Sequence, residues 1–142
     1  MSPDTCEAAA PLIEHNVAAN SYYDSVGYHA AIWAINTDDA LFQYNEAYLT
    51  RNTLDGMGFD IDELCNRCVM QYNYSHDNEG GFMLLVGQRG EGTGYDTGGV
   101  VRYNVSENDG TALIQAVGRM DDYRVYNNTF YTGTGMNGRF LM

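Results

Sequence analysis

The sequence contains no lysine, and its seven basic residues are all arginines. It carries 19 Asp and Glu residues, so the formal net charge is −12. A surface of this sign repels nucleic acids and anionic membranes, and we exclude both as partners. It also disfavours polyanionic sugars unless Ca²⁺ bridges the two. A lysine-free, acidic surface fits a salty habitat and ordinary solubility equally well.

Long apolar runs are missing as well. No stretch approaches the ~20 residues of a membrane-spanning helix. The N-terminal "MSPDTCEAAAPLIEHN" lacks the basic start and apolar core of a signal peptide. Either the chain is intracellular, or a leader and preceding sequence are absent, and the repeat described below favours the second. We therefore expect an extracellular or cell-surface origin. The length predicts a single domain over residues 1–142, complete or a fragment of a longer chain.

Cysteine is scarce, with three residues in the chain. Cys65 and Cys68 form a lone C-x-x-C without a second pair or a nearby His, which argues against zinc. The motif does not open a helix after a strand, as a thioredoxin-like pair would. Buried thiols are the first interpretation, a disulfide the second and zinc the third, and the state of Cys6 stays open.

The chain does contain an internal repeat, in which a short strand-like run ends in Asn. It occurs five times, as "PLIEHN", "ALFQYN", "CVMQYN", "VVRYN" and "YRVYN", ending at Asn16, Asn45, Asn73, Asn104 and Asn127. The steps are 29, 28, 31 and 23 residues. The residue before the Asn is His or Tyr, at His15, Tyr44, Tyr72, Tyr103 and Tyr126. The third residue before it is apolar in the first four runs, whereas Arg124 interrupts the column.

Each Asn is followed by a Gly-containing turn and a further strand-like run, such as "MGFDID", "FMLLVG" or "TALIQAVG". No segment has the 3.6-residue stripe of an amphipathic helix. Three short strands per repeat predict an all-β parallel solenoid, in which equivalent strands stack at ~4.8 Å. Stacked Asn side chains can then hydrogen-bond as an asparagine ladder, and Asn tolerates the left-handed backbone of a tight corner.

Three segments carry a resemblance to a known family: "DGMGFDIDELCNRCVMQYNYSHDNEGGFML" (55–84), "VVRYNVSENDG" (100–110) and "VYNNTFY" (125–131). They resemble right-handed parallel β-helix repeat proteins, the superfamily of pectate-lyase-like polysaccharide lyases and many-stranded glycoside hydrolases. The resemblance covers roughly residues 12–132. It implies a right-handed parallel β-helix, here of about five coils, and a secreted protein acting on polysaccharides. It carries no catalytic motif onto this chain.

The alternation of side chains along a strand predicts which residues face outward. In "GFDID" we expect Phe59 and Ile61 inside, and Asp60 and Asp62 outside. In the preceding coil the single Trp, Trp33, also points out. In the later coils the same rule predicts Phe82, Leu84, Ala112 and Ile114 inside, and Met83, Leu85, Leu113 and Gln115 outside.

This outer face combines groups suited to carbohydrate chemistry. The ring of Trp33 can stack on a sugar, and Asp60 and Asp62 can act as catalytic acid and base. With Glu63, the two aspartates can instead bind Ca²⁺, the one cofactor that the sequence suggests. A solvated polar strand face is the simpler interpretation of the same residues.

The turns add further candidates. His76 can act as a base near neutral pH, although a solvated His at a turn is the commoner case. His29 and Asp55 lie on the corresponding turns of the first two coils. Glu79, beside His76, is assigned to substrate binding.

The longest inter-strand loop is "GQRGEGTGYDTGG", residues 87–99. Long loops on rigid scaffolds often carry function. We assign Arg89 and Tyr95 in this loop, together with Trp33, to substrate binding.

Fold alone does not select a function. The sequence favours a carbohydrate-active domain that acts on or binds an extracellular polysaccharide or oligosaccharide, as a lyase or a glycoside hydrolase. The alternative is a non-catalytic solenoid that binds glycan or serves as a structural module. No amphipathic capping helix is recognisable, so end-to-end self-association through uncapped coils is a further expectation.

Overall fold

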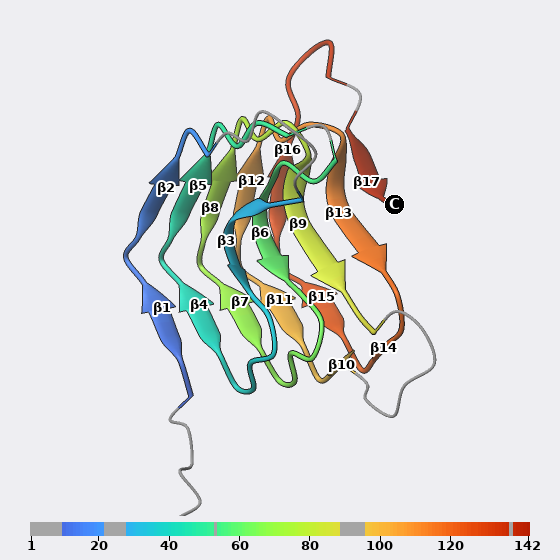
Figure 1. Ribbon diagram of the computed structural model, residues 1–142. Coiled ribbons are helices and arrows are strands. Elements are labelled where there is room, and N and C mark those ends of the chain that lie inside the picture. Colours follow the sequence, from blue (N-terminus) through green and yellow to red (C-terminus); the bar gives the residue numbers. More distant parts are fainter. Residues whose placement is uncertain (1–9, 22–27, 53, 89–95, 137) are drawn as a thin grey trace, which may run out of the picture.

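The computed structural model describes residues 10–21, 28–52, 54–88, 96–136 and 138–142, and these contain strands, turns and loops but no helix. Within these ranges there is accordingly no helix long and apolar enough to cross a membrane. Most strands belong to three parallel sheets of five strands each, stacked coil upon coil (Figure 1). The all-β parallel β-helix predicted from the repeat is confirmed.

The strands of each sheet follow one another in chain order. The first sheet contains β1 (Leu12–Glu14), β4 (Leu41–Gln43), β7 (Val69–Gln71), β11 (Val100–Arg102) and β15 (Arg124–Tyr126). The second contains β2 (Val17–Ala19), β5 (Glu46–Tyr48), β8 (Tyr74–His76), β12 (Val105–Glu107) and β16 (Thr129–Tyr131). The third contains β3 (Ala30–Ala34), β6 (Met57–Ile61), β9 (Gly81–Val86), β13 (Ala112–Val117) and β17 (Arg139–Leu141). A small pair consists of β10 (Asp96–Thr97) and β14 (Met120–Asp121).

A row of hydrogen-bonded Asn side chains joins the coils at the corner between the first and second sheets. Each side-chain amide donates to the Oδ1 of the next Asn at 2.9–3.0 Å, and the same Oδ1 accepts the backbone N–H of the preceding Asn. The row consists of Asn16, Asn45, Asn73, Asn104 and Asn128. It satisfies polar groups that the corner removes from water.

The last member of this row corrects the sequence alignment. The repeat placed Asn127 at the fifth position, but the amide of Asn104 donates to Asn128, 24 residues further on. The strand register accordingly puts Val125, not Arg124, in the apolar column of the first sheet. Arg124 appeared to interrupt the apolar column because the fifth repeat had been aligned one residue too early.

The residue before each Asn, rather than the Asn itself, takes the left-handed backbone. Its φ is 55° at Tyr44, 54° at Tyr72 and 56° at Tyr103. The rings of these three tyrosines stack along the corner with centroids 5.3–5.5 Å apart. Contacts between neighbouring rings and the adjacent Asn hydrogen bonds help to offset the cost of this conformation.

The interior lies between the three sheets and is filled mainly by apolar side chains, including Phe42, Phe59, Met70 and Phe82. Phe59 and Ile61 are fully buried there, as the alternation predicted. Cys65 and Cys68 are buried and free, in agreement with the first interpretation of the C-x-x-C, and Cys6 lies outside the described residues.

The alternation predicted for the third and fourth coils is partly wrong. Met83 and Leu85 belong to the interior cluster, whereas Leu84 belongs to an apolar cluster on the outer face. The cause is that Phe82 and Met83 both contribute to the interior, so the alternation slips by one residue.

In β13 the same slip affects Ala112. It was expected inside but belongs to the outer cluster, whereas Ile114 lies inside as predicted. Leu113, expected outside, is buried.

Candidate functional site

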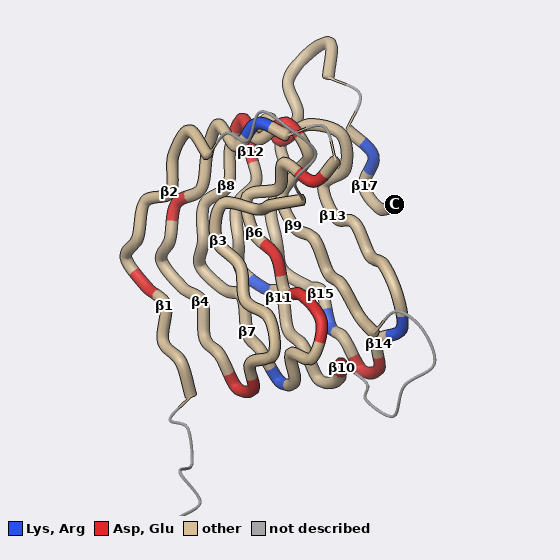
Figure 2. Tube along the Cα trace, viewed as in Figure 1, with Lys and Arg blue, Asp and Glu red and all other residues tan. Residues whose placement is uncertain are grey.

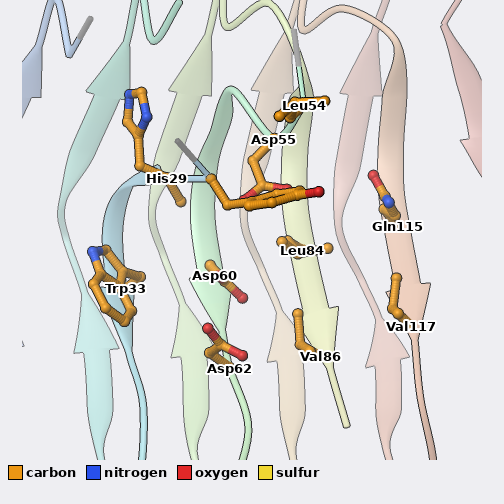
Figure 3. Close-up of a pocket in the computed structure, with 12 residues that line it drawn as sticks. His29, Trp33, Leu54, Asp55, Asp60, Asp62, Leu84, Val86, Gln115 and Val117 are labelled. Atoms are coloured by element: carbon orange, nitrogen blue, oxygen red, sulfur yellow. The ribbon is translucent and has the colours of Figure 1, made fainter. Parts of the chain in front are cut away.

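A pocket of about 320 Å³ lies on the outer face of the third sheet (Figure 3). Its walls come from four of the five strands of that sheet and from the loops that lead into them. The lining residues are Tyr28, His29, Ala30, Trp33, Leu54, Asp55, Asp60, Asp62, Leu84, Val86, Gln115 and Val117. Acidic residues lie on β6 and on the corner loops (Figure 2).

Strand geometry brings Trp33 and the two predicted aspartates together. Asp60 pairs with Trp33 in β3 on one side and with Leu84 in β9 on the other. Asp60 and Asp62 lie on the same face, with Cα atoms about 6.6 Å apart from the strand rise. Both carboxylates point into the pocket beside the Trp ring (Figure 3). The predicted grouping of these three residues is therefore present.

The three residues differ in their exposure to water. Asp60 is only 5% exposed, whereas Trp33 is 51% exposed. Asp62 is half-buried, and its Oδ1 accepts the backbone N–H of Glu63 at 2.7 Å. A shielded carboxyl group on a pocket floor, next to a more solvated one, is typical of acid–base sites.

The pocket floor is apolar. Leu84 and Val86 point outward from the sheet, yet they are 4% and 2% exposed. They form a cluster with Ala30, Met57 and Ala112, against which Val117 packs. Such a floor excludes water around the carboxylates and strengthens electrostatic interactions there.

Asp55 is a third acidic residue of the pocket, although sequence reasoning assigned it only to a turn. The Oδ1 of Asn52 accepts the backbone N–H groups of Leu54 and Asp55 at 2.8 and 3.2 Å, which shapes the turn. The carbonyl of Asp55 also lies so close to Gly80 that a Cβ at Gly80 would collide with it. The Asn52 side chain, typical of an Asx turn, was the available sequence signal.

His29 also lines the pocket, and in Figure 3 its ring is directed away from Asp60 and Asp62. Its Nδ1 lies 3.4 Å from the side-chain amide of Asn52, and its Nε2 lies 3.5 Å from the carbonyl of Ser21. The first and second coils are thus linked beside the pocket.

His76, predicted as a catalytic base, lies on the second sheet and does not line the pocket. Its ring stacks between Tyr48 and Tyr74, with centroids 4.7 and 4.6 Å away. Its two nitrogens lie 2.9 Å from an Asp77 carboxylate oxygen and 3.1 Å from one of Glu46. Burial lowers the pKa of His76, but these hydrogen bonds outweigh it, so the pKa is raised overall. The structure does not bring His76 to the pocket aspartates.

The other predicted site residues fall into three groups. Glu79 is exposed and lines a neighbouring pocket rather than the main one. Arg89 and Tyr95 lie outside the described residues, as does most of the 87–99 loop. Glu63 follows Asp62 but does not line the main pocket.

The described part of the chain contains no group of three or more His, Cys, Asp or Glu side chains that could hold a metal ion. The possible calcium site of Asp60, Asp62 and Glu63 stays a prediction.

Comparison with known proteins gives related sequences and structures. The chain is 30% identical to a lacto-N-biosidase from Bifidobacterium longum subsp. longum, over 85% of this chain and 8% of that protein. The crystal structure of a GH136 lacto-N-biosidase from Eubacterium ramulus, as the selenomethionine derivative, superposes with a TM-score of 0.65 and 26% identity. That match covers 87% of this chain and 25% of that chain. The native form matches with a TM-score of 0.56 and 28% identity, over 73% and 20% of the two chains.

The chain thus spans 8% of the length of the Bifidobacterium relative. No protein-family model matches it. The likeness to pectate-lyase-like proteins stays a prediction.

Proposed function

We propose that this chain carries the pocket of a glycoside hydrolase that acts on an oligosaccharide. One observation supports this most directly: Asp60 of β6 and Asp62, which directly follows this strand, share a pocket with a Trp from the neighbouring coil. The names of the relatives, lacto-N-biosidases, point in the same direction. A glycan with a lacto-N-biose unit is therefore the first substrate to test.

Hydrolysis of a glycosidic bond needs two carboxyl groups in different protonation states. One, as the acid, gives its proton to the glycosidic oxygen while the bond to the anomeric carbon breaks. The other, as the carboxylate, attacks the anomeric carbon or takes a proton from the water that does so. In this pocket Asp60 and Asp62 are the proposed pair, and Asp55 is the third carboxyl group within the same walls.

The remaining walls position the sugar. Trp33 offers an exposed ring on which the C–H face of a sugar can stack. The apolar floor of Leu84 and Val86 keeps water away from the bond to be cut. An extracellular or cell-surface location suits such a substrate and stays a prediction.

The test is hydrolysis of a p-nitrophenyl glycoside of lacto-N-biose by the wild-type chain and its variants. We expect Asp60→Asn and Asp62→Asn each to lower kcat/KM by about 10²–10⁴-fold, because an amide can act neither as the acid nor as the nucleophile or base. Asp55→Asn shows whether the third carboxyl group belongs to the pair. Asp121→Asn, an exposed acid away from the pocket, is the matched control and should leave activity unchanged. Full activity of both pocket variants would exclude this pair.

The second candidate function is non-catalytic glycan binding. It is favoured by the apolar floor beside Trp33. Binding of lacto-N-biose by the wild-type chain without any hydrolysis, and with equal affinity in Asp60→Asn, would support it over the enzyme.

A further inference from the structure

The two ends of the stack expose strand edges that no other strand of the described residues covers. β1, β2 and β3 are the outermost strands at the N-terminal end, and β15, β16 and β17 are outermost at the C-terminal end (Figure 1). Such edges present unpaired backbone groups, which pair readily with strands of another chain. All pairings within the three large sheets are parallel, so a chain that continues the stack must run in the same direction.

The row of Asn side chains ends in opposite hydrogen-bonding groups at the two ends. Inside the row, the Oδ1 of Asn73 accepts the backbone N–H and the side-chain amide of Asn45. At the C-terminal end, the backbone N–H of Asn128 has no acceptor among the described residues. At the N-terminal end, the Oδ1 of Asn16 has no donor among them. One end thus offers the donor, and the other end offers the acceptor, that meet inside the row.

Exposure to water separates the end members of this row from the inner ones. Asn45, Asn73 and Asn104 are at most 2% exposed, whereas Asn16 is exposed and Asn128 is half-buried. A further coil at either end would give the end members the same shielded surroundings as the inner ones. Hydrogen bonds between such groups are strongest where water is excluded.

A second polar row, on the outer face of the first sheet, has the same complementary ends. Gln43 donates to the Glu14 carboxylate at 2.8 Å, and Gln71 donates to Gln43 at 3.0 Å. Arg102 donates to Gln71 at 2.9 Å and to the Tyr126 hydroxyl at 3.0 Å. The row therefore begins with a carboxylate and ends with a phenol. The phenol accepts from Arg102 and retains its own proton for a further acceptor, and a carboxylate is the strongest one.

A single register matches both rows. The strand pairings place Tyr126 beyond Arg102, in the row that begins at Glu14. If a second copy continues the first sheet by one coil, its Glu14 therefore lies opposite Tyr126. In the same register its Asn16 lies opposite Asn128, because each Asn follows these residues by two positions.

The apolar interior is open at the same two ends. The interior column of the second sheet begins at Ala18 and ends at Phe130, and the column of the third sheet begins at Ile32 and ends at Leu141. In a continued stack the Phe130 ring meets the small Ala18 side chain, and the exposed Leu141 meets Ile32. The opposite end of the same chain thus supplies both the polar groups and the apolar surface that each end lacks.

We propose that the chain associates head to tail with further copies of itself, with the C-terminal end of one copy against the N-terminal end of the next. Asn128 of one copy then donates to Asn16 of the next, and Tyr126 donates to Glu14. The two joined surfaces differ, so the contact is heterologous, and a straight stack continues as a filament instead of closing. With five strands in each sheet, the copies repeat about every 24 Å along the filament.

The net charge of −12 on each copy opposes this association, and salt screens the repulsion. Sedimentation velocity of the full chain over a series of protein concentrations is the first measurement. We expect the mean mass to rise with protein concentration. Association should be at least about fivefold stronger in about 0.5 M than in about 0.05 M sodium chloride.

Two variants, each blocked at one end, test the direction of the contact. Val17→Glu with Ala18→Glu blocks the N-terminal end, and Phe140→Glu with Leu141→Glu blocks the C-terminal end, because a carboxylate buried without a partner is strongly unfavourable. Each variant alone should stay monomeric, since its open end finds only blocked partners. An equal mixture of the two should form dimers and nothing larger.

The matched control is Leu64→Glu with Val105→Glu, which adds the same charge at exposed apolar side chains away from both ends of the stack. It should assemble like the wild-type chain, and circular dichroism establishes that every variant is folded. Dimers of either blocked variant alone would indicate a contact between like ends and overturn the proposal. A mixture that stays monomeric, or a wild-type chain that is monomeric at every protein and salt concentration, would overturn it as well.

Discussion

A single residue in this protein acquires its role from the coil above and the coil below. Asp60 is a strand residue like its neighbours in sequence, but its partners across the sheet are Trp33 and Leu84. One offers an exposed ring, and the other contributes to an apolar floor. His76, by contrast, does not belong to the pocket. It contacts Tyr48 and Glu46 of the preceding coil in a cluster on the second sheet.

The His76 cluster predicts a dependence of stability on pH. The folded protein raises the pKa of His76, so the protonated ring stabilises the fold below the unfolded pKa of about 6.5, and this contribution is lost as pH rises through the folded pKa. We expect His76→Gln to make the difference in unfolding free energy between about pH 5.5 and 8.5 smaller, because glutamine does not take up a proton in this range.

Urea unfolding at both pH values measures this difference. His15→Gln is the matched control, because His15 stacks on Tyr44 at the end of the ring row and its change leaves the Glu46 and Asp77 contacts in place. An unchanged pH dependence in His76→Gln would contradict the prediction.

At the scale of elements, the corners carry much of the polar chemistry that holds the coils together. A central Asn of the row, such as Asn73, accepts from one neighbouring coil and donates to both neighbouring coils. Asn16, at the end of the row, has an Asn partner in only one of them. The hydrogen bonds of such a row contribute most to stability where the groups are buried and water cannot replace the missing partner.

Asn73→Ala should therefore destabilise the protein by about 3 kcal/mol, because it leaves buried groups of Asn45 and Phe42 without their hydrogen bonds. Asn16→Ala should cost about 1 kcal/mol, since its groups are partly solvated. Chemical denaturation of the two variants checks the ranking. Equal losses would mean that the row does not act through burial.

The whole molecule is a stack in which each coil contacts mainly its neighbours. The outermost strands of each sheet have a partner on one side within the described residues. Exposed apolar side chains accompany them at the C-terminal end, namely Phe140, Leu141 and Val125. Association of two copies through these edges, and the extent of the domain over residues 1–142, stay predictions.

Unequal protection against hydrogen exchange follows from this architecture. We expect amides of β7 and β9, in the middle of the stack, to exchange at least about tenfold more slowly than those of β15 and β17. Exchange measured by mass spectrometry at a protein concentration low enough to prevent association gives the comparison. Uniform protection from end to end would indicate that the coils unfold as one cooperative unit.

The repeat of Asn and Tyr was sufficient to predict the parallel β-helix. In such a stack, equivalent positions of successive coils carry similar residues, so the sequence repeats with the length of one coil. The alternation of side chains along the strands also predicted that Trp33, Asp60 and Asp62 share one face, since this alternation is a local property of the chain.

Only the tertiary structure decided the rest. Phe82 and Met83 both face the interior, so the alternation of inward and outward side chains in β9 is displaced by one residue. Leu84 therefore faces outward and forms part of the pocket floor. Asp55 lines the pocket because of a turn shaped by Asn52 and by the close approach of Gly80. His76 lies on the second sheet, away from the pocket. These outcomes depend on packing between coils about 28–31 residues apart in sequence, a distance over which local patterns hold no information.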